Sequence, residues 1–195
     1  MIKYFSIIIG LLLAGTVHAQ DYGLEIGIHQ STASYNSSDS SGWLAGASSP
    51  SISGALGFDL GVHASFDLVP NLKFRTGIMY DVRPFQFKTA AGNLNINYAY
   101  IDVPVDVQYN FNDMFGIFGG LVVGIKAGDS YSAPGSWGSL QSDNMKSLYP
   151  LVNVGANFTF DNMIGFDVYY EYGLGDFADN LKNYSTFGLR FIYWL

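Results

Sequence analysis

Residues 100–111 read YIDVPVDVQYNF, and their alternation decides the fold. One set of alternate positions is apolar throughout and comprises Ile101, Val103, Val105, Val107, Tyr109 and Phe111. The other set contains two carboxylates and a proline, and comprises Tyr100, Asp102, Pro104, Asp106, Gln108 and Asn110. Because successive side chains of a β-strand point to opposite faces, the stretch predicts a strand that is apolar on one face and charged on the other.

The same alternation recurs in eight segments, at 22–34, 53–66, 72–86, 95–110, 115–127, 148–160, 164–174 and 185–195. Three of the connections are short (67–71, 110–114 and 161–163). The others are mostly longer and rich in Ser, Gly, Asn and Asp (35–52, 87–94, 128–147 and 175–184). Short turns that alternate with longer loops are typical of outer-membrane barrels. We therefore predict an all-β fold, an eight-stranded antiparallel up-and-down transmembrane β-barrel over residues 20–195.

Charges fall on one face of these strands only. The apolar face carries none, whereas the opposite face carries Glu25, Asp59, Lys73, Arg75, Asp81, Arg83, Asp102, Asp106, Lys126, Asp167, Glu171 and Arg190. A basic residue facing lipid costs about 2–4 kcal/mol near the midplane of the bilayer. Half of these charges in lipid would cost on the order of 10 kcal/mol, which is comparable with the whole stability of a domain. The charges are therefore expected inside the barrel and the apolar face in the membrane, where only a closed sheet satisfies its backbone.

Seven acidic and five basic residues on the inward face nearly balance. Eight strands leave an interior just wide enough for side chains, so we expect a salt-bridged network that plugs the barrel. A narrow ion path is the alternative. We also expect an interior pair between Glu25 and His63, because the predicted register puts residue 63 opposite 24 or 25 and residue 29 opposite 58. His29 and His63 then lie too far apart to share a metal ion, and neither a metal nor another cofactor is expected.

The beginning of the chain predicts export. Lys3 precedes an apolar run over 7–14, and Val17-His18-Ala19 has small residues at the cleavage positions, so 1–19 read as a signal peptide. The chain has no cysteine, which excludes disulfides and a lipoprotein anchor. Its formal net charge of −7, without a basic cluster, argues against a nucleic-acid partner.

Aromatic residues are placed where the barrel would cross the two membrane surfaces. One group at the short turns comprises Phe66, Tyr109, Phe111, Phe115, Phe160 and Tyr193, and a second group nearer the long loops comprises Tyr80, Tyr172 and Phe187. The pattern predicts a protein of the Gram-negative outer membrane with both termini in the periplasm. The alternative is a soluble, lipocalin-like carrier that would bury the apolar face and expose the charges.

Residues Tyr100-Ile101-Asp102-Val103-Pro104, followed by Val105, Asp106, Val107 and Tyr109, carry a family resemblance. They resemble the aromatic-x-x-aliphatic-Pro signature in the fourth strand of the outer membrane protein beta-barrel domain proteins of Bacteroidetes-type bacteria. That group includes PorT-like and OmpX-like small barrels. Members usually carry more basic residues after the proline, where this chain has Asp106. The resemblance implies an eight-stranded outer-membrane barrel without a defined biochemical activity, or an accessory component of an envelope secretion or assembly machine.

The last strand also resembles a signal read by the outer-membrane assembly machinery. Phe187–Leu195 alternates apolar residues outward and ends in Tyr193-Trp194-Leu195, where such signals usually end in Tyr-x-Phe. The resemblance implies that this machinery is a partner, in addition to outer-membrane lipid.

Three further features bear on function. Pro104 has no backbone N–H to donate to a neighbouring strand, which predicts a bulge or one missing hydrogen bond.

His29, Ser31 and Asp39 lie in the region where outer-membrane lipid acyltransferases place His, Ser and Asp. Serine and aspartate are abundant in this region for ordinary turn reasons, so we expect no enzyme and no catalytic residue. Tyr131 and Trp137 in 128–145 are the candidates for recognition of an envelope or extracellular protein or glycan.

Overall fold

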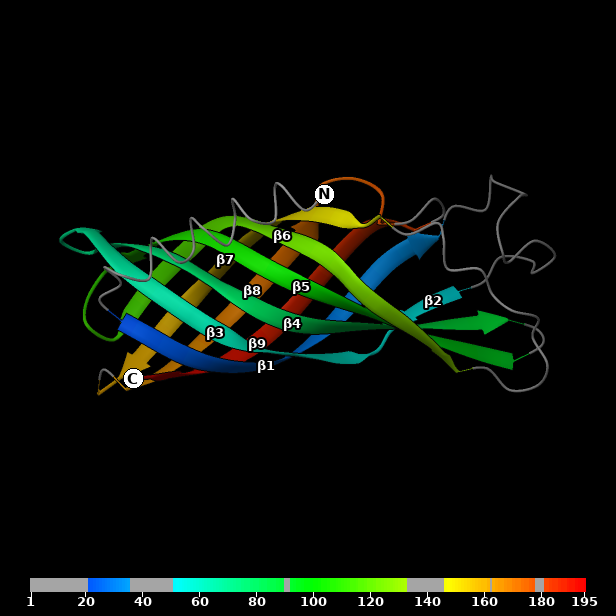
Figure 1. Cartoon of the computed structure of the whole chain (residues 1–195), viewed down its shortest axis with the longest axis horizontal. Helices are drawn as coiled ribbons and strands as arrows, with labels where there is room; N and C mark the ends of the chain where they lie inside the picture. The colour runs from blue at the N-terminus through cyan, green and yellow to red at the C-terminus, as the bar shows by residue number, and fades with distance from the viewer. Residues whose placement is uncertain (1–20, 36–50, 90–91, 133–145, 162, 178–180) are drawn as a thin grey trace.

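In the computed structural model the chain is a closed β-barrel (Figure 1). The structure describes residues 21–35, 51–89, 92–132, 146–161, 163–177 and 181–195. The predicted signal peptide lies outside these residues. The strands are β1 (Asp21–Tyr35), β2 (Ser51–Gly54), β3 (Leu56–Val69), β4 (Leu72–Thr89), β5 (Gly92–Asn110), β6 (Phe115–Ser132), β7 (Leu148–Phe160), β8 (Ile164–Gly173) and β9 (Leu181–Trp194). Within the same residues, no helix has the length and apolar character needed to cross a membrane.

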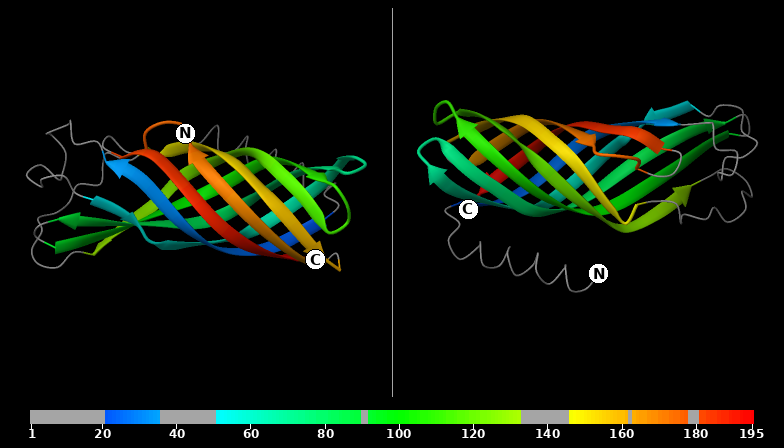
Figure 2. Two further views of the ribbon diagram at one scale, coloured as in Figure 1. Left: turned by 180° about the vertical axis from the view of Figure 1, so that it is seen from behind. Right: turned by 90° about the horizontal axis from the view of Figure 1, so that it is seen from above.

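Eight strands form the ring, in the order β4, β3, β1, β9, β8, β7, β6, β5. All neighbours pair antiparallel, and the additional pairing of β4 with β5 closes the ring. Strand β2 is short and pairs with the last residues of β4 (85–88). It follows the same edge of β4 as β3, which pairs with residues 72–82. The predicted eight-stranded antiparallel barrel is therefore confirmed, and Figure 2 shows its tilted strands from two further sides.

The two ends of the barrel differ in their connections. At the end that we call the turn end, β3–β4, β5–β6 and β7–β8 are joined by short turns, and β1 begins and β9 ends. Asn71 and Asp161 adopt left-handed backbone angles there (φ 68° and 51°), which asparagine and aspartate tolerate better than most residues. In the β5–β6 turn, the backbone N–H groups of Met114 and Phe115 donate to Asn112 Oδ1.

At the opposite end, which we call the loop end, β4, β5, β6 and β9 are longer than predicted, and β9 begins at Leu181. The pairing of β4 with β5 continues to Thr89 and Gly92, and that of β5 with β6 continues to Ser132. The pairing of β6 with β7 already ends at Ile125 and Leu148. Strands β4, β5 and β6 therefore project beyond the rest of the wall, as the right side of Figure 1 shows.

Pro104 leaves a gap in the ladder and no bulge towards β4. The pairing of β4 with β5 is interrupted between Thr76–Val105 and Met79–Asp102 but resumes in the same register. The hydroxyl of Thr76 donates a hydrogen bond of 2.8 Å to the carbonyl oxygen of Pro104. The bulge in the pairing of β5 with β6 lies elsewhere, on β6: Ala99 and Tyr100 of β5 pair with Gly128 and Lys126, so Ala127 is the extra residue. Of the two predicted alternatives, the missing ladder bond is thus the one that occurs.

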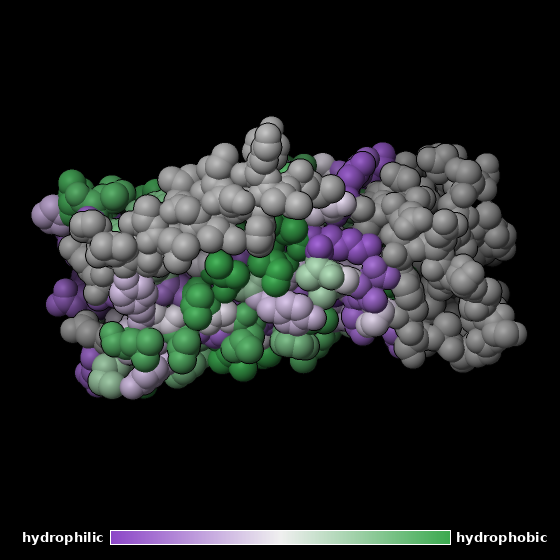
Figure 3. Space-filling model, in the orientation of Figure 1, coloured by the Kyte–Doolittle hydropathy of each residue, from purple (hydrophilic) through white to green (hydrophobic). Residues whose placement is uncertain are grey.

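The outer face of the wall is apolar. Leu60 and Leu121 are exposed by 56% and 48%, whereas the inward-facing Asp59 is fully buried. On the face drawn in Figure 3, apolar side chains gather over the described part of the wall, with hydrophilic residues towards the loop end. At the turn end, Phe111 stacks on Phe115 with ring centres 5.5 Å apart, and Tyr109 and Phe158 flank them. A soluble carrier would require the reverse orientation, so the lipocalin-like alternative was wrong.

Candidate functional site

The barrel interior holds the charged residues singled out in the sequence. All eleven are at least 95% buried: Glu25, Asp59, His63, Arg75, Asp81, Arg83, Asp102, Asp106, Asp167, Glu171 and Arg190. Lys73 and Lys126 differ, because they are partly exposed and pair with Asp21 and Asp129. Among the residues that the structure describes, the buried interior therefore contains seven carboxyl groups and three guanidinium groups. The near balance predicted from the sequence was wrong for this reason.

Arg75 links opposite walls of the barrel. From β4, its Nη2 atom donates to Asp167 Oδ2 on β8 at 2.5 Å, and its Nη1 atom donates to Gln108 Oε1 at 2.6 Å. Strands β4 and β8 are four places apart in the ring of eight, so they face each other across the interior. Asn157 Nδ2 donates to the other oxygen of Asp167 at 2.6 Å, which leaves this carboxylate fully bonded.

The environment of His63 fixes its tautomer. The Nε atom of Arg75 donates to His63 Nε2 at 2.9 Å, so Nε2 is an acceptor. The ring hydrogen is then on Nδ1, which lies 3.2 Å from Glu25 Oε2. The expected Glu25–His63 pair is therefore formed, although the register differs by one or two residues from the prediction: His63 lies opposite Gly23 and His29 opposite Gly57.

A second cluster surrounds Arg190 on β9. Its Nε atom donates to Asp59 Oδ1 and its Nη2 atom to Glu171 Oε1, both at 3.1 Å. The guanidinium lies 3.7 Å above the ring of Tyr169, whose hydroxyl donates to Asp59 at 3.0 Å. Strand β1 separates β3 from β9, and its Gly27 lies opposite both Asp59 and Arg190. A Cβ atom at Gly27 would lie 2.5 Å from the Asp59 carboxylate and would displace it, so glycine leaves room for this ion pair across β1.

A third cluster lies around Arg83 on β4. This fully buried guanidinium donates to Asp81 at 2.7 Å and to Asp102 at 2.5 Å. It also lies 4.7 Å from the ring centre of Tyr100, a distance typical of a cation–π contact. His29 connects this cluster with the previous one, because its ring nitrogens lie 3.6 Å from Asp59 and 3.4 Å from Asp81.

Towards the loop end the interior changes from charged to aromatic. Phe177, from the connection between β8 and β9, lies at the centre of the cluster and stacks on Tyr184 with ring centres 4.9 Å apart. Its ring centre is 5.0 Å from that of Tyr149. The buried members are Phe85, Ile96, Tyr98, Tyr100, Val122, Tyr149, Leu151, Phe177, Leu181 and Tyr184. Sequence reasoning missed this cluster, although the inward positions 96, 98, 100, 149 and 151 are all apolar or aromatic.

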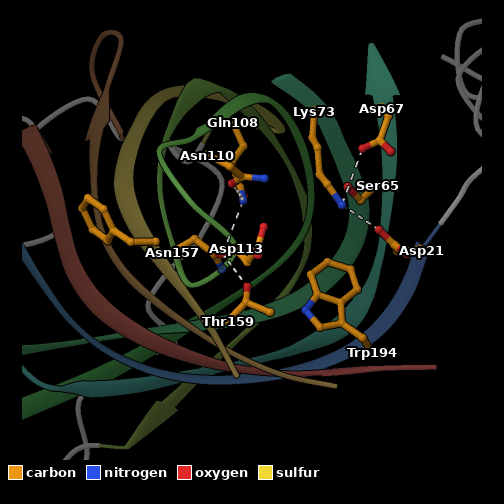
Figure 4. Close-up of a pocket in the computed structure, with 11 residues that line it drawn as sticks. Asp21, Ser65, Asp67, Lys73, Gln108, Asn110, Asp113, Asn157, Thr159 and Trp194 are labelled. Atoms are coloured by element: carbon orange, nitrogen blue, oxygen red, sulfur yellow. Dashed lines mark hydrogen bonds and ion pairs between the residues drawn. The ribbon is translucent and has the colours of Figure 1, made fainter. Parts of the chain in front are cut away.

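At the turn end the interior opens into a polar cavity of about 400 Å³ (Figure 4). Lys73 lies on one wall, 2.8 Å from Asp21 and 3.5 Å from Asp67. On another wall, Gln108 Nε2 donates to Asn110 at 2.6 Å. The lining residues are Asp21, Ser65, Asp67, Lys73, Gln108, Asn110, Asp113, Phe115, Asn157, Thr159 and Trp194. This cavity opens the charged half of the interior at the turn end.

The acyltransferase-like residues have separate partners. Ser31 is fully buried, and its hydroxyl lies 2.8 Å from Thr186 Oγ1 and 3.0 Å from the Tyr184 hydroxyl, whereas His29 faces the two carboxylates. Asp39 lies outside the described residues. Of the recognition candidates, Tyr131 pairs with Ile96 in the projecting part of β6, and Trp137 lies outside the described residues.

The family follows from a sequence comparison. The model of the outer membrane protein beta-barrel domain matches residues 18–179. The chain belongs to this family. Membership indicates an outer-membrane location for the barrel. No match was found among curated proteins.

Two solved structures of small barrels resemble the fold. Ail, the attachment invasion locus protein of Yersinia pestis, was solved in complex with the heparin analogue sucrose octasulfate. It is 16% identical, the match covers 90% of this chain and 98% of Ail, and the TM-score is 0.55. Neisserial surface protein A is 14% identical, with coverage of 88% and 96% and a TM-score of 0.55. At these identities the likeness concerns the fold.

Proposed function

We propose that this protein is a non-catalytic outer-membrane barrel with a structural or interaction role, and that its interior is sealed against ion flow. The observation that supports the proposal is the aromatic cluster around Phe177. It lies between the charged clusters and the loop end, and its rings are in contact across the interior. Ions that entered through the turn-end cavity would have to leave through this apolar layer, where an unpaired charge is strongly disfavoured.

Conductance in planar lipid bilayers tests this proposal. The purified barrel is expected to give no stable channel current. A Phe177→Ala/Tyr184→Ala variant, which removes the two stacked rings, is expected to conduct, while the matched variant Phe166→Ala removes a ring from the lipid side and remains closed. A steady current through the unmodified protein would refute a sealed interior and support the narrow ion path instead.

We further propose that the turn end and both termini face the periplasm, with the loop end outside the cell. Short periplasmic turns and longer extracellular loops are the rule in bacterial outer-membrane barrels. The chain contains no cysteine, so single cysteines can report the orientation. In intact cells, a membrane-impermeant thiol reagent is expected to label Lys88→Cys near the loop end and to spare Asp113→Cys at the turn end. The reverse labelling pattern would overturn this orientation.

Interaction is the role that we assign to the loop end. Strands β4, β5 and β6 project there, Tyr131 lies in the projecting part of β6, and Trp137 follows in the sequence between β6 and β7. The proposed partner is an envelope or extracellular protein or glycan, and not a nucleic acid. Deletion of residues 133–145 is expected to abolish binding of this protein or glycan partner. The barrel is still expected to assemble through its final strand, Phe187–Leu195.

The second candidate is an accessory component of an envelope secretion or assembly machine in a Bacteroidetes-type bacterium. The motif Tyr100–Pro104 supports it, by its resemblance to PorT-like proteins. A mild-detergent pull-down of the tagged barrel from its own outer membrane distinguishes the two roles. Stoichiometric co-purification of other envelope proteins would favour the machine component. A barrel that is recovered alone would favour an autonomous surface protein.

A further inference from the structure

Asp106 differs from the six other interior carboxyl groups. Each of those six has a carboxylate oxygen within 2.5–3.6 Å of an arginine or histidine nitrogen. Asp106, which is 2% exposed, has no such partner among the residues that the structure describes. A buried carboxylate without a cation is strongly disfavoured, and proteins usually neutralise such a group. Asp106 therefore requires a positive charge that the described side chains do not supply.

The nearest candidate, Arg75, is already engaged. It lies opposite Asp106 in the pairing of β4 with β5, but its Nε, Nη1 and Nη2 atoms donate to His63, Gln108 and Asp167. The other charged groups near Asp106 add up to no net charge. Two are cationic and two are anionic: Arg75 on β4, Arg190 on β9, and Asp167 and Glu171 on β8. Strand β6 places Gly120 beside Asp106, and β7 places the neutral Asn153 next to that glycine.

Asn153 supplies half of a complementary pair. Its Nδ2 atom donates to Asp106 Oδ2 at 3.1 Å. The other two oxygens, Asp106 Oδ1 and Asn153 Oδ1, are buried and have no hydrogen-bond partner among the described residues. Both of these oxygens are acceptors, and a single hydrogen bound to one of them could be donated to the other. A carboxylic acid and a carboxamide provide it when they pair through two hydrogen bonds, one in each direction.

We propose that Asp106 is a proton-binding site inside the barrel, where it exists as a neutral carboxylic acid paired with the Asn153 amide. The proton removes the uncompensated charge and supplies the missing donor at once. A water molecule could donate to both oxygens but would leave the charge in place. The space at Gly120 is part of the site, because a Cβ atom there would lie 2.5 Å from Asp106 Oδ1.

Infrared spectroscopy of the barrel with isotope-labelled aspartate, at neutral pH in lipid vesicles, tests the site directly. The expected spectrum contains the carbonyl stretch of a protonated aspartate. Asp106→Asn removes that intensity, and the control Asp59→Asn leaves it, because Asp59 is paired with Arg190 at 3.1 Å. A spectrum with no protonated aspartate, or one in which Asp106→Asn leaves the band intact, overturns the proposal.

Unfolding provides a second measurement that does not depend on band assignment. Asp106→Asn keeps the shape of the side chain and removes only the need for the proton, so its denaturation midpoint is expected to equal or exceed that of the parent. Asp59→Asn breaks an ion pair and is expected to lower it. If a sodium ion and not a proton neutralised Asp106, added NaCl would raise the midpoint of the parent but not that of Asp106→Asn. That outcome, or an equal loss in both variants, contradicts the proposal.

Discussion

Replacement of Arg83 by methionine tests the energetics of the charged interior. Arg83 is fully buried, donates to Asp81 and Asp102, and lies against the ring of Tyr100. Methionine fills much of the same volume but leaves two buried carboxyl groups without their shared cation. Breaking a buried ion pair by removal of one partner typically costs about 3–5 kcal/mol. We expect a loss of this size in the free energy of unfolding for Arg83→Met.

The measurement is urea unfolding of the barrel in lipid vesicles, followed by tryptophan fluorescence. The triple variant Arg83→Met/Asp81→Asn/Asp102→Asn removes the stranded charges and is expected to regain more than half of the loss. Lys73→Met is the control, because its ion pair at the turn end is partly exposed and such pairs contribute only about 0–1 kcal/mol. A loss below about 1 kcal/mol for Arg83→Met, or a triple variant no more stable than the single one, would refute the reasoning from buried charge.

Three other perturbations test packing and membrane contact. Phe177→Ala removes the central ring of the aromatic cluster and should lower the free energy of unfolding by about 3–5 kcal/mol, as measured by the same urea titration. Gly188→Ala places a Cβ atom 2.4 Å from the Tyr169 ring and should cost roughly 1–3 kcal/mol, whereas Gly128→Ala, which meets nothing within 4 Å, should be neutral. Leu121→Arg puts a charge on the lipid face and should cost about 2–4 kcal/mol in vesicles if Leu121 lies near the midplane, whereas Leu174→Arg beyond β8 should cost little.

The topology of the barrel could be predicted from sequence because each strand alternates strictly. Residues 101–109 show why: one charge on that face would have been too costly in lipid, so the orientation of the whole strand follows from its composition. The ends of the strands were less predictable. The loop-end parts of β4, β5 and β6 lie beyond the apolar wall, where the membrane no longer constrains the sequence. The alternation of apolar and polar residues therefore weakens there before the strand pairing ends.

The interior was predictable in its residues but not in its contacts. The alternation of apolar and charged positions showed that Arg75 and Asp167 point inward. Their ion pair, however, depends on which strands face each other and on how far each side chain reaches. The alternation also could not show that Lys73 lies at the rim of the barrel, where its amine pairs with Asp21. Because that amine is not in the buried interior, the interior has fewer cations than predicted. Phe177 was missed because it lies in a connection, where no alternation marks the side chain as inward.

The Arg75–Asp167 ion pair has a mechanical consequence for the cylinder. Ladder hydrogen bonds hold each strand to its neighbours, but a ring held only along its circumference can flatten into an ellipse without breaking any of them. An uneven lateral force, such as contact with a neighbouring protein on one side, would squeeze the cylinder in this way. The hydrogen bond of 2.5 Å between Arg75 and Asp167 joins opposite walls of the barrel, so it resists a change in the distance between those walls. The wall sets the diameter of this barrel, and its contents add resistance to flattening.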